Sequence, residues 1–222
     1  MEWAKFVFPM RDPGEVLRQS DGTVFARTAQ QSVLGARPAT ALSPVALWSG
    51  TCSQIDSPDD PAMLFESSPH NWGTRGWASL DESVQRWVDA GLGASLLVRT
   101  HASHVVSDAP SATRFATRWA DSGVRLVYDP VSMVTPGMAG STGLADLYTR
   151  LIDSLENPNL RRAVACVLVC NLRVEGSRVL ACAMEDGLLD PALVQSVIGR
   201  CADLGVPVAM LTGDRPPYTP PR

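Results

Sequence analysis

The sequence predicts an α/β fold built around a parallel β-sheet, and three observations indicate it. Apolar runs of strand length, of which residues 163–169 form the most uniform, lack the alternation of half-exposed strands and are typical of strands buried on both faces. Amphipathic helical segments follow most of these runs. In the second half of the chain, strands and helices alternate strictly, which is the pattern of βα units in a parallel sheet.

Eight such strands are predicted, and this number favours a compact, closed (β/α)8 barrel. They cover residues 6–9, 23–26, 45–48, 62–65, part of 94–104, 124–128, 163–169 and 206–211. The helices are short or irregular in the N-terminal half, which keeps the barrel small. We expect one barrel domain over residues 1–215 and a proline-rich tail over 216–222. A doubly wound open sheet is the alternative, but no GxGxxG turn follows the first strand.

Helix signals are clearest after residue 78. Ser79 is placed to cap a helix that Glu82 supports three residues later and that Gly91 ends. Further amphipathic helices are expected over residues 111–121, 144–155 and 190–205. Weaker signals predict brief helical segments from residue 12 and over 29–35, and a glycine-rich loop over 134–142.

Composition excludes several classes of protein. The 222 residues carry a net charge of −4 and no basic run, so we expect no nucleic-acid partner. No apolar run has the length of a membrane span, and the first residues lack a signal-peptide pattern, so we expect no membrane association and a cytoplasmic location. Five cysteines form no CxxC pair, which favours reduced, buried thiols.

Polar side chains gather where the predicted strands end, and in parallel α/β folds chemistry collects at that edge. The residues at these ends are Arg11, Arg27, Ser49, Glu66, Arg99, His101, His104, Asp129, Asn171, Arg173, Thr212 and Asp214. Two loops nearby add candidates. One carries His70 and Trp72, and an acidic glycine loop carries Glu185.

The stretch from Ala94 to His104 is the centre of this set. His101 and His104 lie three residues apart, a spacing that allows a shared metal ion or anion, with Asp129 and Glu66 as further ligands. Either histidine could instead be structural, as a helix cap or a partner of a backbone carbonyl.

The sequence leaves two alternatives open for Asp129 and two for Arg99. Asp129 precedes a proline that holds it extended, so its carboxylate either takes part in catalysis or pairs with Arg99. Arg99 either binds a phosphate or carboxylate or neutralises Asp129.

From residue 77 onward, the order of motifs resembles the xylose isomerase-like TIM barrels, a superfamily of sugar phosphate isomerases/epimerases and AP-endonuclease relatives. The motifs are a strand ending in RTH, a strand ending in YDP, a glycine loop, a strand ending in CNLR, the MEDG loop and an Asp-Pro helix before the last strand. In that superfamily, the corresponding motifs are Glu-Pro-His, an Asp strand end, His-x-Lys-Asp, Gly-Glu-Gly and a final Glu.

Position by position, the resemblance is uneven. His101 matches the histidine of the first motif, but Arg99 stands where the metal-binding glutamate is expected. Asp129 matches the family aspartate, and Ser132 replaces a histidine or asparagine. In the next motifs, Asn171 falls at the aspartate, Leu168 at the histidine and Cys170 at the lysine; Glu185 and Gly187 keep the acidic loop, and Thr212 replaces the last glutamate.

The resemblance implies a barrel that acts on or binds a small sugar, polyol or sugar phosphate, with the divalent-metal site lost or rebuilt. In an isomerase of this kind, His101, Asp129, Glu66 and Glu185 would move protons, and Arg99, His70, Trp72, Asn171 and Arg173 would bind substrate. The alternative is a pseudoenzyme that binds a ligand or another protein. No cofactor is expected beyond a divalent metal at a relocated site. Whether the chain forms a homo-oligomer is left open by the sequence.

Overall fold

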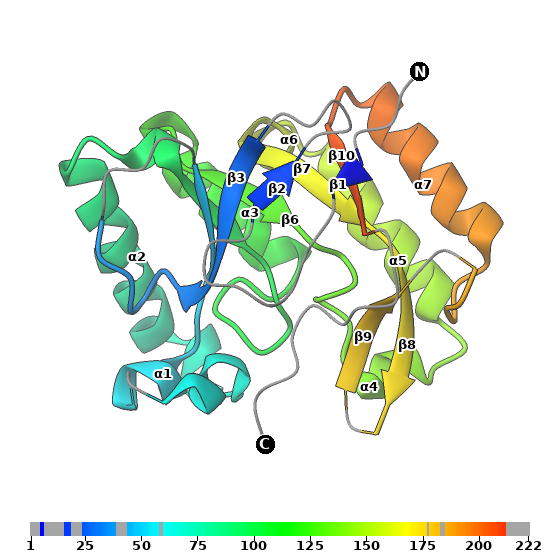
Figure 1. The fold of residues 1–222 in the computed structure, drawn as a ribbon, viewed down its shortest axis with the longest axis horizontal. Helices are drawn as coiled ribbons and strands as arrows, with labels where there is room; N and C mark the ends of the chain where they lie inside the picture. Colours follow the sequence, from blue (N-terminus) through cyan, green and yellow to red (C-terminus); the bar gives the residue numbers. More distant parts are fainter. Residues whose placement is uncertain are drawn as a thin grey trace.

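The structure, a computed structural model, describes residues 5–6, 16–18, 24–38, 44–57, 60–176, 178–182 and 185–211. A curved eight-stranded sheet forms its centre (Figure 1). In spatial order the strands are β1 (Lys5–Phe6), β10 (Val208–Leu211), β7 (Val164–Val169), β6 (Arg125–Tyr128), β5 (Leu96–Arg99), β4 (Val45–Trp48), β3 (Val24–Ser32) and β2 (Val16–Arg18). Every neighbouring pair is parallel except β2 with β3, so the predicted parallel α/β class is confirmed.

The two edge strands of this sheet approach each other. Cα atoms of β1 and β2 come within 8 Å, although no ladder pairing joins them among the described residues. The sheet therefore curls toward a barrel, and its described pairings leave the seam between β1 and β2 open. Strand β2 is antiparallel and three residues long, so it does not extend the parallel ladder.

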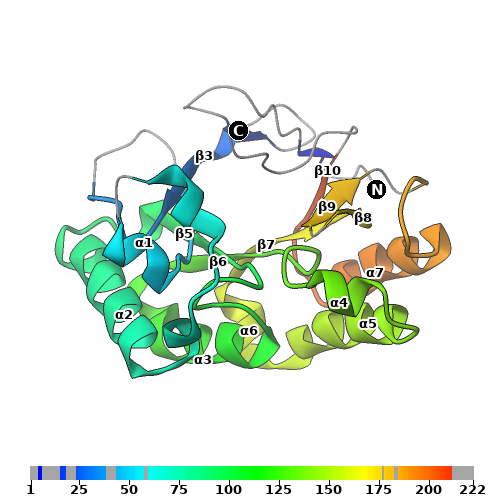
Figure 2. The same ribbon diagram turned by 90° about the horizontal axis from the view of Figure 1, so that it is seen from below.

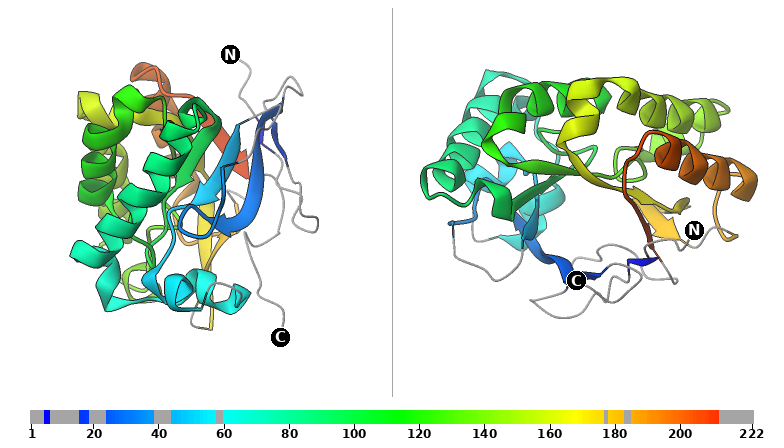
Figure 3. Two further views of the ribbon diagram at one scale, coloured as in Figure 1. Left: turned by 90° about the vertical axis from the view of Figure 1, so that its left-hand side faces the viewer. Right: turned by 90° about the horizontal axis from the view of Figure 1, so that it is seen from above.

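Helices cover the convex face of the sheet. Figures 2 and 3 show the longer ones along this face: α2 (Thr74–Asp89), α3 (Ala109–Trp119), α6 (Pro158–Ala163), α5 (Leu144–Asp153) and α7 (Pro191–Asp203). The shorter helical pieces are α1 (Cys52–Asp56), η1 (Pro61–Phe65), η2 (Pro69–Trp72), η3 (Gly93–Ser95), η4 (Ala120–Ser122), α4 (Pro136–Ala139) and η5 (Ser154–Glu156). No helix in the described ranges is long and apolar enough to cross a bilayer.

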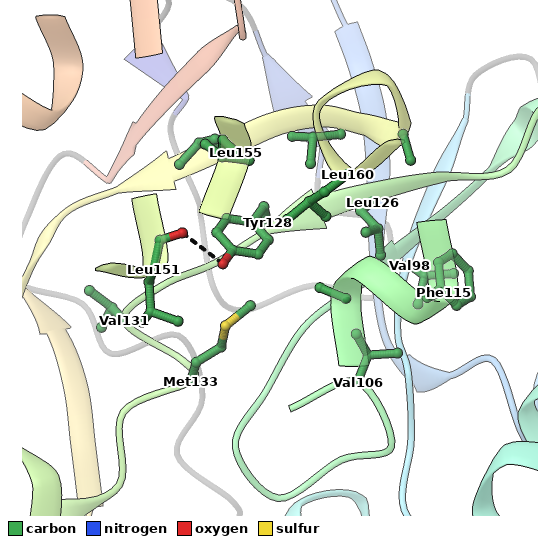
Figure 4. Close-up of a cluster of buried hydrophobic side chains, with 14 of the residues drawn as sticks. Val98, Val106, Phe115, Leu126, Tyr128, Val131, Met133, Leu151, Leu155 and Leu160 are labelled. Carbon is green, nitrogen blue, oxygen red and sulfur yellow. Dashed lines mark hydrogen bonds between the residues drawn. The ribbon is translucent and has the colours of Figure 1, made fainter. Parts of the chain in front are cut away.

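The strands are buried on both faces, as their apolar runs predict. The larger core lies between sheet and helices, where Tyr128 donates a hydrogen bond of 2.9 Å to the carbonyl of Leu151 (Figure 4). A second core lies on the concave face and consists mostly of small side chains: Ala26, Ala46, Leu97, Val127, Ala165, Cys166, Leu168 and Ala209. Small residues suit this face because a tightly curled sheet leaves little room along its axis.

All five cysteines are free and buried, as expected. Burial raises the pKa of the Cys166 thiol to about 12 and that of Cys201 to about 11. These thiols pack as small apolar side chains.

A separate hairpin, β8 (Asn171–Glu175) with β9 (Arg178–Cys182), follows the central strand β7. This hairpin is not among the elements predicted from the sequence. Its signal is the alternation of polar and apolar residues over 171–175, followed by a short connection in which Gly176 has φ +59°, a conformation that favours glycine.

Three local predictions are wrong. Residues 62–65 form the 3₁₀ helix η1, because Pro61 at its start has no N–H for a ladder and the apolar run is short enough for one helical turn. Residues 29–32 continue β3 and are not helical. Helix α2 begins at Thr74 with Gly73 as its N-cap, so Ser79 lies inside it. The predicted helix from residue 12 and the tail over 216–222 lie outside the described residues.

Candidate functional site

At the carboxyl ends of the strands, the concave face of the sheet carries large and charged side chains in place of small ones. Side chains on a strand alternate between faces, so Trp48 shares the face of Ala46, and Arg99 shares that of Leu97. Strand register pairs Trp48 with Arg99. Asp129 follows β6, two residues beyond Val127. A layer of large and charged residues therefore lies above the small-residue core.

Arg99 and Asp129 form a buried ion pair in this layer. The Arg99 Nε and Nη2 donate to Oδ2 of Asp129 at 3.0 and 2.6 Å, and the side chains are 8% and 3% exposed. The guanidinium carbon lies 4.0 Å from the ring centroid of Trp48, a cation–π contact. Ser132 donates its N–H to Oδ1 at 3.1 Å and its hydroxyl to Oδ2 at 2.6 Å. Asp129 therefore accepts four hydrogen bonds from two residues.

Four rings pack together beside this pair, from Trp48, Phe65, His101 and His104. Their centroids lie between 4.7 and 5.6 Å apart. Nδ1 of His101 accepts from the Ser103 N–H at 3.1 Å. Nε2 of His104 lies 2.7 Å from the carbonyl of Leu64. The strand delivers both histidines to one place, as predicted, but their nearest neighbours are aromatic.

Both imidazoles are neutral in this setting. Burial, with the Arg99 charge adding to it, lowers the pKa of His101 to about 3. Burial also lowers the pKa of His104 well below its usual value, and the neighbouring His101 and Arg99 act in the same direction. A second proton on either ring would be placed among apolar rings beside a cation.

The segment from η1 to η2 lies over the loop that follows β5, and a buried asparagine ties the two together. The Asn71 amide donates to the carbonyl of Ser103 at 2.7 Å, and its oxygen accepts from the Cys52 N–H at 2.6 Å. The segment presents Glu66 and His70 to solvent. It also presents Trp72, which is 53% exposed.

Trp72 is fixed in place although its ring is open to solvent. Its Nε1 donates to the hydroxyl of Ser107 at 2.9 Å, and Ser107 is buried just before α3. The other described tryptophans, at positions 48, 77, 87 and 119, are no more than 6% exposed. Trp72 therefore presents an indole face whose polar edge is already satisfied.

The remaining candidates lie around the hairpin. Asn171 is fully buried: its amide donates to the Leu189 carbonyl at 2.7 Å, and its oxygen accepts from the N–H groups of Leu172 and Leu189. Nε of Arg173 lies 2.9 Å from Oε1 of Glu175, and Glu185 is exposed. Asn171 thus anchors the loop that carries Glu185.

The structure therefore divides the predicted site residues into three groups. Arg99, His101 and Asp129 meet at the ends of β5 and β6. Glu66, His70 and Trp72 share one segment, whereas Asn171, Arg173 and Glu185 belong to the hairpin and its following loop. Trp48 and Phe65 were missed as members of the first group. The period of two in β4 could have placed Trp48 on the concave face; no local signal places Phe65 there.

Arg11, Thr212 and Asp214 lie outside the described residues, and Arg27 lies within β3.

The residues at the ends of β5 and β6 do not fit a divalent cation. Arg99 brings a positive charge to this place, and Asp129 directs both oxygens to protein donors. Among the described residues, no group of three or more His, Cys, Asp or Glu side chains has the arrangement to hold a metal.

Comparison with known proteins adds neighbours from solved structures only. No family model matches the chain, and no curated protein matches it. The chain is similar to a xylose isomerase-like TIM barrel protein from Mycobacterium smegmatis, solved in complex with magnesium, with a TM-score of 0.48 and 11% identity. This match covers 76% of the chain but only 54% of that protein, about half its length.

A second similar structure is endonuclease IV from Thermus thermophilus. The TM-score is 0.42 and the identity 18%, over 78% of this chain and 70% of that one.

Proposed function

We propose that this chain binds a small sugar or polyol at the carboxyl-end rim of its sheet and does not isomerise it. The observation that carries the proposal is the set of four hydrogen bonds that Arg99 and Ser132 donate to Asp129. The carboxylate that the sequence suggested as a catalytic group has its lone pairs directed to protein donors.

The neighbouring histidines support the same conclusion. General acid–base catalysis is most efficient when the pKa of the group lies near the working pH. The pKa of His101 is lowered to about 3, so at neutral pH its imidazole is uncharged and only a weak base. Arg99 and the hydrogen-bonded Asp129 do not fit the divalent cation that would stabilise an enediolate, so the residues at the ends of β5 and β6 supply little of the chemistry of a sugar isomerase.

Exposed side chains at the carboxyl-end rim, namely Trp72, His70 and Glu66, support binding of a sugar. Trp72 presents an indole face, and carbohydrate rings stack their apolar C–H faces on such surfaces. Its Nε1 bond to Ser107 fixes the ring before a ligand arrives, which lowers the entropy cost of binding. His70, on the same helical turn, and Glu66 offer exposed polar groups for hydroxyls. The sequence resemblance supplies the ligand class, and the exposed indole favours a neutral ring.

The test is a ligand titration of protein labelled with 5-fluorotryptophan. Neutral monosaccharides, polyols and sugar phosphates are added separately, and the fluorine resonance assigned to Trp72 through Trp72→Phe is followed. We expect a neutral sugar or polyol to shift that resonance saturably. Trp72→Ala should weaken binding by about tenfold, the order expected for loss of one aromatic stacking contact of about 0.5–1.5 kcal/mol together with its buried area.

Leu188→Ala is the matched control, because Leu188 is 54% exposed, about as much as Trp72, and its N–H bonds to Leu172 of the hairpin. The variant should bind as the unaltered chain does. If none of the ligands binds, the proposal fails. Binding with turnover of the sugar would instead favour an isomerase that uses the exposed carboxylates Glu66 and Glu185.

A further inference from the structure

Exposed apolar side chains gather around the hairpin. Four large hydrophobic residues are well exposed in the described part of the chain: Trp72, Met138, Val174 and Leu188. Val174 belongs to β8. Leu188 donates its N–H to the Leu172 carbonyl of the same strand at 2.8 Å, and α4, which carries Met138, packs against β8 and β9 (Figure 1). Three of the four therefore surround one strand, and such a patch is typical of an interaction surface.

The outer edge of β8 carries backbone groups oriented for pairing. In an antiparallel pair, successive residues direct their N–H and C=O groups alternately toward and away from the partner strand. The carbonyl of Leu172 points away from β9, since it accepts from Leu188. Val174, two residues on, shares that orientation, and its backbone groups have no partner within the described ranges. β8 is thus an edge strand that can accept another strand.

The sequence at this edge is complementary to itself. Arg173 and Glu175 flank Val174 and lie on one face of the strand, with Nε 2.9 Å from Oε1. If two β8 strands pair antiparallel about a twofold axis at Val174, the two Val174 residues exchange N–H···O=C bonds. Each Arg173 then lies directly opposite Glu175 of the other copy. Opposite charges directly across two strands are stabilising, and like charges there are destabilising.

We propose that this edge is a dimerisation surface and that its occupant is β8 of a second copy of this chain. The pairing forms a four-stranded antiparallel sheet, β9–β8 with β8–β9 of the other copy. The two Val174 side chains then lie opposite each other on one face of this sheet. The paired segment is only a few residues long, so the dimer is a weak one that forms and dissociates with concentration. A twofold contact of this kind closes on itself and limits the assembly to two copies.

Sedimentation equilibrium over a wide range of protein concentration tests the proposal. We expect a monomer–dimer equilibrium for the unaltered chain. Arg173→Glu places four glutamates around the axis and should raise the dimer dissociation constant by at least about tenfold. The double variant Arg173→Glu/Glu175→Arg restores opposite charges across the axis and should restore the original constant. A merely structural role for Arg173 would not produce that recovery.

Val174→Pro is the second variant. Proline removes the N–H that faces outward and leaves the β8–β9 ladder intact, so circular dichroism should be unchanged while the dimer is lost. A chain that is monomeric at every concentration overturns the proposal, and so does a dimer that responds to neither Arg173→Glu nor Val174→Pro. The outcome is distinguishable from that of sugar binding, because the variants leave Trp72 and its hydrogen bond to Ser107 unchanged.

Discussion

Arg99 and Asp129 follow neighbouring parallel strands and form an ion pair within the concave face of the sheet, with Nη2 2.6 Å from Oδ2. The pair is buried beneath the rim and stacks on Trp48. A buried pair of this kind is costly to break, because removing one partner leaves the other charge without compensation. The pair therefore contributes to stability at the carboxyl ends of β5 and β6.

Asp129→Asn should lower the free energy of unfolding by about 3–5 kcal/mol, because the buried guanidinium of Arg99 then loses the carboxylate to which it donates two hydrogen bonds. Urea denaturation measures the loss. The double variant Arg99→Met/Asp129→Asn should be less destabilised than the sum of the two single changes, since the charges disappear together. Additive losses would show that the two side chains do not act as a pair.

Acid should destabilise the protein through its buried histidines. The pKa of His101 is about 3 in the folded chain and near 6.5 when unfolded, so the unfolded state binds more protons between these values. Stability from this group is therefore complete above about pH 6.5 and falls as the pH drops toward 3. His104, whose pKa is also lowered, adds to the loss. Urea titrations from about pH 4.5 to about pH 8 should show this slope.

His101→Gln should flatten that dependence, because the titrating group is gone while a polar side chain remains. Equal slopes for the unaltered chain and His101→Gln would contradict a buried neutral imidazole at position 101.

Gly187→Ala should destabilise the loop that carries Glu185. A Cβ at position 187 would overlap Cγ and Oδ1 of Asn171, which is buried and hydrogen-bonded on both sides. Overpacking of this kind costs about 1–3 kcal/mol. Gly137→Ala is the control, because no atom lies within 4 Å of its added methyl group. Thermal unfolding of the two variants should differ clearly; equal melting temperatures would contradict the packing of Gly187 on Asn171.

Chelation should leave thermal stability unchanged. The ends of β5 and β6 offer a cation and an occupied carboxylate in place of free ligands. Dialysis against EDTA, followed by millimolar Mg²⁺ or Mn²⁺, should not move the melting temperature. A ligand at about a hundred times its dissociation constant would add about 2.7 kcal/mol, which is readily detected. A rise of several degrees would contradict the absence of a metal site there.

The sequence by itself determined the α/β class. Apolar strands that alternate with amphipathic helices bury their apolar surfaces best when the helices cover a parallel sheet. It also brought Arg99, His101 and Asp129 to one edge, since parallel strands end on the same side. Local signals failed where a short apolar run fits two structures, as at residues 62–65, which form a 3₁₀ helix and not a strand. The hairpin after β7 was missed although residues 171–175 alternate between polar and apolar side chains.

Only the tertiary structure decided what the edge residues do. Whether Arg99 binds a ligand or neutralises Asp129 depends on how far apart two strand ends lie, and strand register sets that distance. Whether His101 titrates near neutrality depends on Phe65 and Trp48, which arrive from other segments and remove water from the ring. The chemistry of a site depends on how deeply each side chain is buried and on how close segments far apart in the chain come to each other. Residue type and spacing along the sequence give neither the burial nor the distance.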